Sequence, residues 1–172
     1  MKTLIIHPED SSTDFLKNIY LDLDFTIVND INFSKGKLRK LIQSHDRIVM
    51  MGHGSDKGLF TKNRFIIDGS YVQFLKNKDC LFIWCNSNIF VEKHKLSGFY
   101  TGMIVSEPIE ANLYNLNYEQ LPIDESNYKF SQCLKESILL STTDIYYYMI
   151  DNYITTNNNE IVNFNKNNLF SR

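Results

Sequence analysis

The sequence of 172 residues lacks any long hydrophobic run, and its apolar stretches are far shorter than the roughly 18–20 residues that a membrane-spanning helix requires. An excess of one charge is also missing, because 18 Lys and Arg side chains are offset by 20 Asp and Glu side chains, for a formal net charge of -2. Such a balance removes the electrostatic argument for a nucleic acid or an anionic membrane as partner. The composition therefore predicts neither a membrane protein nor a nucleic-acid-binding protein.

The first residues lack the features of a secretory signal. One Lys and a very short apolar stretch precede Pro8 and two acidic residues, which is too little for the apolar region of a signal peptide. We expect instead a buried first strand at Leu4–Ile6 and a cytoplasmic protein.

Cysteine is scarce, and the three Cys residues form no CxxC motif and no metal-ligand pattern with His. Gly52-His53-Gly54 also lacks the spacing of a phosphate-binding loop. We therefore expect neither a metal site nor a cofactor. An odd number of Cys in such a chain indicates free thiols, each of which is either a small core residue or a nucleophile. We expect Cys80 and Cys133 to be core residues.

Short apolar runs alternate with amphipathic segments of helical spacing over the first two-thirds of the chain. Strands that are apolar throughout and alternate with helices of about ten residues are typical of a parallel sheet covered on both faces. The sequence predicts an α/β fold, with a doubly wound, mostly parallel five-stranded sheet of caspase-like or flavodoxin-like order 2-1-3-4-5, flanked by helices. The expected strands are Leu4–Ile6, Phe25–Val28, Ile48–Met51, Cys80–Trp84 and Tyr100–Val105.

The length suits one domain, so we expect a single domain over residues 1–172. Residues 1–115 are expected to form the α/β core, which includes a hairpin at about Leu59–Ile67. Residues 116–172 are expected to form a mainly helical extension packed on that core, in which the last dozen residues carry no assignment.

Polar segments follow four of the expected strands, at residues 7–11, 52–55, 85–88 and 106–107. In a doubly wound sheet, the loops at the carboxyl ends of the strands carry the functional groups. His53 follows one buried strand and Cys85 ends the next, so both side chains should emerge at one edge of the sheet. There, an imidazole and a helix N-terminus favour the thiolate of a Cys that is otherwise a weak nucleophile. The N–H groups of Gly54 and Cys85 are candidates for an oxyanion hole.

These residues resemble a known family. An apolar strand followed by His-Gly (IVMMGHGS), then a second apolar strand ending in Cys (CLFIWCNSN), is similar to the caspase–gingipain–metacaspase clan of cysteine peptidases. In this sequence Cys85 lies 32 positions after His53. The resemblance covers about residues 1–115 and implies a His53–Cys85 dyad, with the Gly54 backbone in the oxyanion hole. One departure is the bulky Trp84, where the family usually has a small residue.

The sequence therefore predicts a minimal caspase-like cysteine hydrolase that acts on a peptide or protein substrate. Candidate substrate-binding residues at the same edge are Ser106, Glu107, Asp10 and Asn86. Each has an alternative: Glu107 as a helix-start carboxylate, Asp10 with Ser12 as a helix cap, and Cys85 as a core thiol. The alternative function is a non-catalytic module that binds a small polar ligand or a protein on the same fold.

Overall fold

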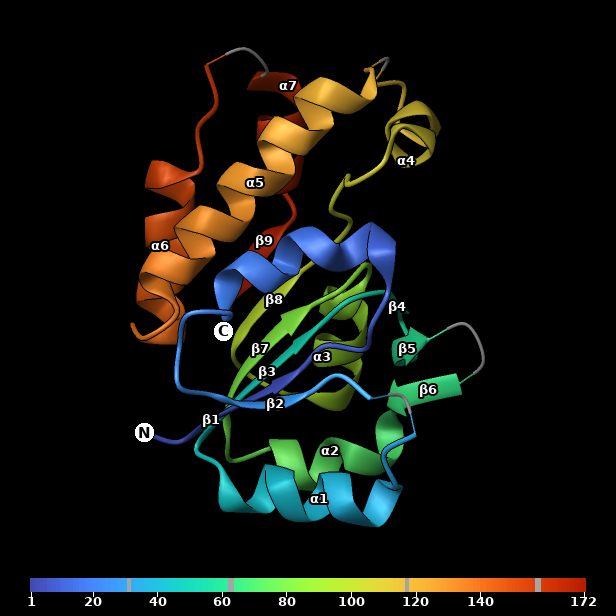
Figure 1. The fold of residues 1–172 in the computed structure, drawn as a ribbon, viewed down its shortest axis with the longest axis vertical. Coiled ribbons are helices and arrows are strands. Elements are labelled where there is room, and N and C mark those ends of the chain that lie inside the picture. Colours follow the sequence, from blue (N-terminus) through green and yellow to red (C-terminus); the bar gives the residue numbers. More distant parts are fainter. Residues whose placement is uncertain (31, 62–63, 117, 157–158) are drawn as a thin grey trace.

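A computed structural model of the chain describes residues 1–30, 32–61, 64–116, 118–156 and 159–172, and its fold is shown in Figure 1. Six strands form the central sheet in the order β2-β1-β3-β7-β8-β9. The first five strands in this order are parallel, and β9 runs antiparallel to β8. The expected α/β class with a mostly parallel sheet is therefore confirmed. The strand bounds are β1 Thr3–Ile6, β2 Thr26–Val28, β3 Arg47–Met51, β7 Asp79–Ile83, β8 Phe99–Thr101 and β9 Leu169–Ser171.

Helices cover both faces of this sheet because the side chains of each strand alternate between the faces and nearly all are apolar. Leu4 and Ile6 pack into one hydrophobic core, and Ile5 between them packs into the other. Full burial of each such side chain contributes about 1.5–3 kcal/mol to folding. Burial on both faces is thus the physical reason for the layered arrangement in Figure 1.

One core lies under α1, α2 and α3, and the other lies under the 3₁₀ helix η1 together with α5 and α6. A third, smaller core joins α4, α5 and α7. None of the helices within the described ranges is long and apolar enough to cross a membrane. The helix bounds are η1 Ser11–Ile19, α1 Lys35–Ser44, η2 Gly69–Tyr71, α2 Val72–Leu75, α3 Ser87–His94, α4 Pro108–Leu113, α5 Gln120–Ser137, α6 Thr142–Asn152 and α7 Asn159–Lys166.

A small antiparallel sheet is inserted between β3 and α2. It consists of β4 (Gly54–Ser55), β5 (Gly58–Thr61) and β6 (Arg64–Ile67), in that order. The expected hairpin is therefore present as β5 and β6, and its turn at residues 62–63 lies outside the described residues. This insertion follows His53 directly and so helps to hold it at the edge of the main sheet.

The sheet differs from the expectation at its far edge, where it has six strands and not five. The expected strand Tyr100–Val105 ends at Thr101, because the backbone beyond it bonds to residues that follow α7 or lie in it. Gly102 N–H donates to the Asn168 carbonyl at 2.7 Å, and Val105 N–H donates to Asn165 Oδ1 at 2.8 Å. The last residues of the chain, for which the sequence supports no assignment, form the additional strand β9.

Arg47, at the start of β3, is a buried charge that joins the sheet to the C-terminal helices. Its side chain is 2% exposed, and its Nε donates to Asp79 Oδ2 at 2.9 Å. The guanidinium also donates to the carbonyls of Ile138 and Leu140, between α5 and α6. Because all these acceptors converge on one side chain, its removal would leave several of them without a partner.

We expect Arg47→Leu to lower the free energy of unfolding by about 3 kcal/mol, since it breaks a buried ion pair and strands two carbonyl groups. Urea unfolding followed by circular dichroism measures this difference, and Lys40→Leu on the exposed face of α1 is the matched control. A loss below about 1 kcal/mol would show that the pair does not hold the helices to the sheet.

Candidate active site

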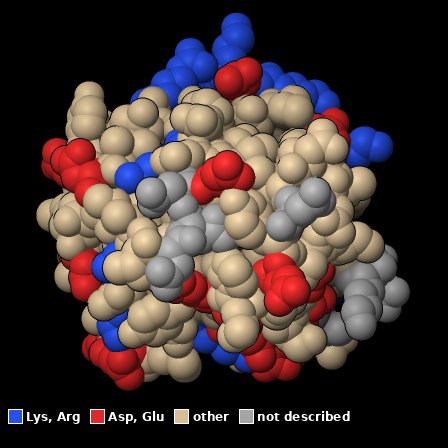
Figure 2. Space-filling model, turned by 90° about the horizontal axis from the view of Figure 1, so that it is seen from above, with Lys and Arg blue, Asp and Glu red and all other residues tan. Residues whose placement is uncertain are grey.

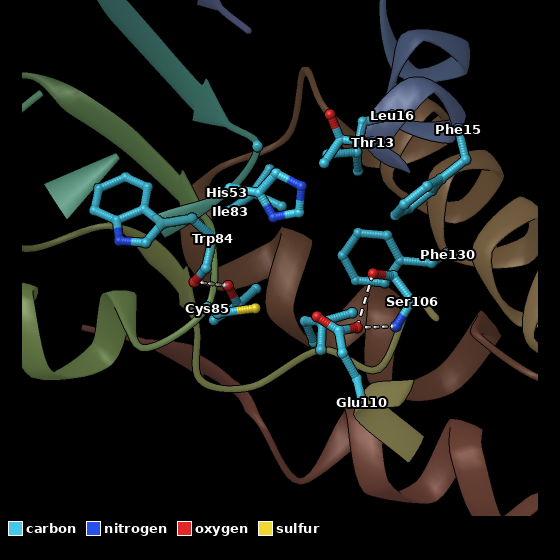
Figure 3. A pocket seen from close by; sticks show the side chains of 13 residues that line it. Thr13, Phe15, Leu16, His53, Ile83, Trp84, Cys85, Ser106, Glu110 and Phe130 are labelled. Carbon is cyan, nitrogen blue, oxygen red and sulfur yellow. Dashed lines mark hydrogen bonds between the residues drawn. The ribbon is translucent and has the colours of Figure 1, made fainter. Parts of the chain in front are cut away.

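The register of β3 and β7 decides where His53 and Cys85 emerge. Met51 at the end of β3 is opposite Ile83 at the end of β7, and Gly52 N–H donates to the Ile83 carbonyl at 3.1 Å. His53 and Cys85 each lie two residues beyond this last pair. Both side chains line the same cavity of about 30 Å³, which has room for one or two water molecules (Figure 3).

His53 is held by two residues at the start of η1. Its Nε2 lies 2.7 Å from Ser12 Oγ and 3.8 Å from Asp10 Oδ1, and its side chain is 35% exposed. Asp10 is the N-cap of η1, where it accepts from the Ser12 N–H at 3.1 Å. Asp10, expected as a substrate-binding residue, therefore lies behind the imidazole and outside the cavity lining.

Cys85 is partly exposed and directs its sulfur into the cavity (Figure 3). In the described part of the chain no hydrogen bond joins its thiol to His53. The expected thiolate is not favoured in this environment: burial and the negative charge of Glu110 raise the pKa of the Cys85 thiol to about 11. The backbone N–H groups of Ile104 and of Cys85 itself act in the opposite direction. At neutral pH the Cys85 side chain is therefore a protonated thiol.

Glu110, and not Glu107, is the acidic residue of this cavity. One of its carboxylate oxygens, Oε2, accepts from the N–H and Oγ of Ser106 at 2.8 and 3.0 Å and from the N–H of Glu107 at 3.2 Å. Figure 3 shows the other oxygen turned toward the side of the cavity where Cys85 lies. These bonds to Ser106 and Glu107, the two residues before α4, hold the carboxylate in place.

A wider groove of about 370 Å³ adjoins the cavity between η1 and α5. Phe15 and Ser106 line both, so the two spaces are neighbours. Glu107 lines this groove, together with Asp124 and Asn127 of α5. The described lining residues carry no Lys or Arg side chain, so the groove is acidic and rich in hydrogen-bond acceptors.

Gly54 has a different role from the expected one. It does not line the cavity, and a Cβ placed on it would lie 1.9 Å from Cδ1 of Trp84. The indole packs over the glycine, and its Nε1 donates to the Ser55 carbonyl at 3.1 Å. Glycine is needed here because Trp84 occupies the space of a side chain. The oxyanion role of Gly54 stays a prediction without support from this geometry.

Asn86 and His7 lie away from the cavity. Asn86 is exposed with φ 65° at the start of α3, and lines neither the cavity nor the groove. His7 is buried under η1 and bonds to Tyr20 Oη at 2.9 Å and to Thr13 Oγ1 at 3.1 Å. Burial, together with the charge of Lys17, lowers the pKa of His7 to about 4, so it is a neutral structural residue. Cys80 and Cys133 are buried, as expected.

Several residues of the site are not among the candidates that the sequence singles out. The sequence explains Ser12 as part of a helix cap, and the structure shows it in the cap of η1 as well as beside His53. Glu110 lies three residues after Glu107 at a helix start, and this spacing is typical of a capping box that turns the Glu110 side chain back toward the residues before the helix. Phe130, Asp124 and Asn127 come from α5, and nothing in a single sequence places that helix beside the edge of the sheet.

Comparison of the sequence with models of protein families and with curated proteins found no match. Among the described residues, no group of three or more His, Cys, Asp or Glu side chains could hold a metal ion. Function is therefore inferred from the geometry of the cavity and the groove.

We expect Gly54→Ala to lower the free energy of unfolding by about 1–3 kcal/mol, because the new methyl group overlaps the indole. Trp84→Ala opens that space, so the double variant should lose less than the sum of the two single losses. Urea unfolding of all four proteins gives the coupling, and strictly additive losses would contradict the packing role of Gly54.

The raised thiol pKa predicts the pH dependence of Cys85 alkylation. The rate with iodoacetamide should rise with pH toward a midpoint of about 11, because only the thiolate reacts. Glu110→Gln removes a repelling charge, lowers that midpoint, and should raise the rate at pH 8 by about three- to tenfold. Glu107→Gln, which alters the groove and not the cavity, is the matched control. A midpoint near or below 8.5 in the parent protein would contradict this picture.

Proposed function

We propose that the protein is a small cysteine hydrolase of caspase-like type that cleaves peptide bonds, with Cys85 as nucleophile and His53 as general base. The observation that carries this proposal is that both side chains, from the ends of adjacent parallel strands, face one cavity beside an open groove.

The raised pKa of the Cys85 thiol favours general-base catalysis by His53 over a preformed thiolate–imidazolium ion pair. In the acylation step, His53 takes the thiol proton while the sulfur attacks the carbonyl carbon. The carbon–nitrogen bond then breaks, and the imidazolium returns the proton to the leaving amine. A water molecule, deprotonated by His53, hydrolyses the thioester and restores the thiol.

Stabilisation of the oxyanion would come from backbone groups next to the sulfur. The N–H groups of Cys85 and Ile104 face the sulfur of Cys85. Fixed N–H donors of this kind, aimed at developing negative charge, are usually worth several kcal/mol of transition-state stabilisation. In this proposal Ile104 takes the place of Gly54 as the second donor.

The charge around the cavity favours a basic substrate. Residues 106–128 carry five acidic residues and no Lys or Arg: Glu107, Glu110, Glu119, Asp124 and Glu125. On the face seen from above, acidic side chains occur across the middle, and Lys and Arg lie mainly at the margins (Figure 2). A Lys or Arg side chain of a substrate would meet Glu107 and Asp124 in the groove, beside the cavity that Glu110 lines.

The second candidate is a binding module without turnover on the same fold. Two observations favour it: the raised pKa of the Cys85 thiol, and the lack of a hydrogen bond between the thiol and His53 in the described part of the chain. In this case the acidic groove would bind a basic peptide segment or a small cationic ligand without hydrolysis.

A library of fluorogenic peptides tests the two candidates. Hydrolysis should favour peptides with Lys or Arg, and Cys85→Ala should abolish it without lowering stability by more than about 1 kcal/mol, since an open strand end contributes little packing. His53→Ala should lower kcat/KM by about 10²–10⁴-fold, and His94→Ala, on α3 outside the cavity lining, is its control. Glu110→Gln should reduce the preference for basic peptides.

Failure to cleave any peptide, together with a sharp loss of stability in Cys85→Ala, would make Cys85 a core thiol. The binding module would then replace the hydrolase. Cleavage that survives Cys85→Ala would contradict the role of the thiol in a different way, since the activity would come from another group.

A further inference from the structure

The hydrogen bonds of Ser12 determine which nitrogen of His53 carries the proton. Ser12 Oγ donates its single proton to Asp10 Oδ1 at 2.8 Å, because an ionised carboxylate can only accept. The 2.7 Å contact between Ser12 Oγ and His53 Nε2 must then be donated by the imidazole. Nε2 therefore bears hydrogen.

The other ring nitrogen is left to act as a base. A neutral imidazole has one N–H, so Nδ1 carries the lone pair when Nε2 is protonated. Among the described residues no hydrogen bond is made to Nδ1, and Figure 3 shows one ring nitrogen of His53 turned into the cavity that Cys85 lines. The geometry thus directs the basic nitrogen to the side of the thiol.

The first turn of η1 holds this arrangement in place. Asp10 Oδ1 also accepts the Ser12 N–H, and the Asp10 carbonyl accepts from Thr13 Oγ1 at 3.1 Å. Thr13 Oγ1 in turn contacts Nε2 of the buried His7. The cap of η1 is therefore tied to the core on one side and to His53 on the other.

We infer that Ser12 and Asp10 form a positioning pair that fixes the Nε2–H tautomer of His53 and presents Nδ1 to Cys85. The catalytic value of the pair rests on the proposed function, although the tautomer itself does not. During acylation the Asp10 carboxylate, 3.8 Å from Nε2, also favours the imidazolium that forms. The charged or titratable groups around the ring are Asp10 before η1, Glu110 on α4, and Cys85 after β7.

The tautomer can be measured without any substrate. Long-range ¹H–¹⁵N spectra of the imidazole rings, recorded at a pH where His53 is neutral, distinguish Nε2–H from Nδ1–H. The parent protein should show Nε2–H at His53, and Ser12→Ala should convert this to a mixture of the two forms. Ser12→Thr keeps the hydroxyl and should restore the parent spectrum. Ser11→Ala, in the same helical turn but exposed, is the matched control.

Kinetics provide the second readout. Ser12→Ala should lower kcat/KM for peptides by about tenfold or more with KM little changed, because the variant misorients the base and removes only one hydroxyl group from the lining of the groove. Asp10→Asn, which preserves a good N-cap, should have an effect of the same kind. Thermal melting shows whether each variant remains folded.

An Nδ1–H form or an equal mixture in the parent protein would overturn the inference, as would an unchanged tautomer in Ser12→Ala. The proposed function fails separately. If the tautomer responds to Ser12 as expected while the parent protein cleaves no peptide, the positioning pair stands and the hydrolase does not. If hydrolysis requires His53 and Cys85 but is unchanged in Ser12→Ala, the hydrolase stands and the catalytic role of the positioning pair does not.

Discussion

The parallel pairing of β3 with β7 is the constraint on which the site depends. The pairing runs without a shift from Arg47 opposite Asp79 to Met51 opposite Ile83, so the segments that follow β3 and β7 leave the sheet side by side. A slip of one residue would exchange the side chains that fill the two cores and would move Arg47 away from Asp79, so close packing and this ion pair both oppose it. The interactions that fix the register therefore also fix where His53 and Cys85 emerge.

The polar groups around the two residues act on them differently. Ser12 and Asp10 lie behind His53 and hold its Nε2, whereas burial and the charge of Glu110, on the side of Cys85, keep the thiol protonated. The thiol in this cavity is protonated in the resting protein, so any reaction at the sulfur must be coupled to proton transfer. A cationic substrate that neutralised Glu110 would lower the pKa of the thiol, which links substrate charge to the reactivity of the nucleophile.

The sequence was informative where a residue's role follows from its own strand. Uniformly apolar runs such as Ile48–Met51 predict buried parallel strands, and residues just beyond them lie at the functional edge by geometry. The sequence was uninformative where the role depends on a distant segment. The far edge of the sheet is formed by β9, whose pairing with β8 includes stacked rings of Tyr100 and Phe170. The sequence pattern of a three-residue strand is too short to predict this pairing.

The sequence by itself determined the class of the fold, the covering of both sheet faces, and the presence of His53 and Cys85 at neighbouring strand ends, because these follow from local periodicity and short-range connection rules. Only the tertiary structure decided that Trp84 covers Gly54, that Ser12 holds the imidazole, and that Glu110 shares the cavity with the thiol. These contacts join segments as far apart as η1, β4 and α4. Which side chains meet there depends on how helices dock on the sheet, and that docking is a property of the packed core that no local pattern encodes.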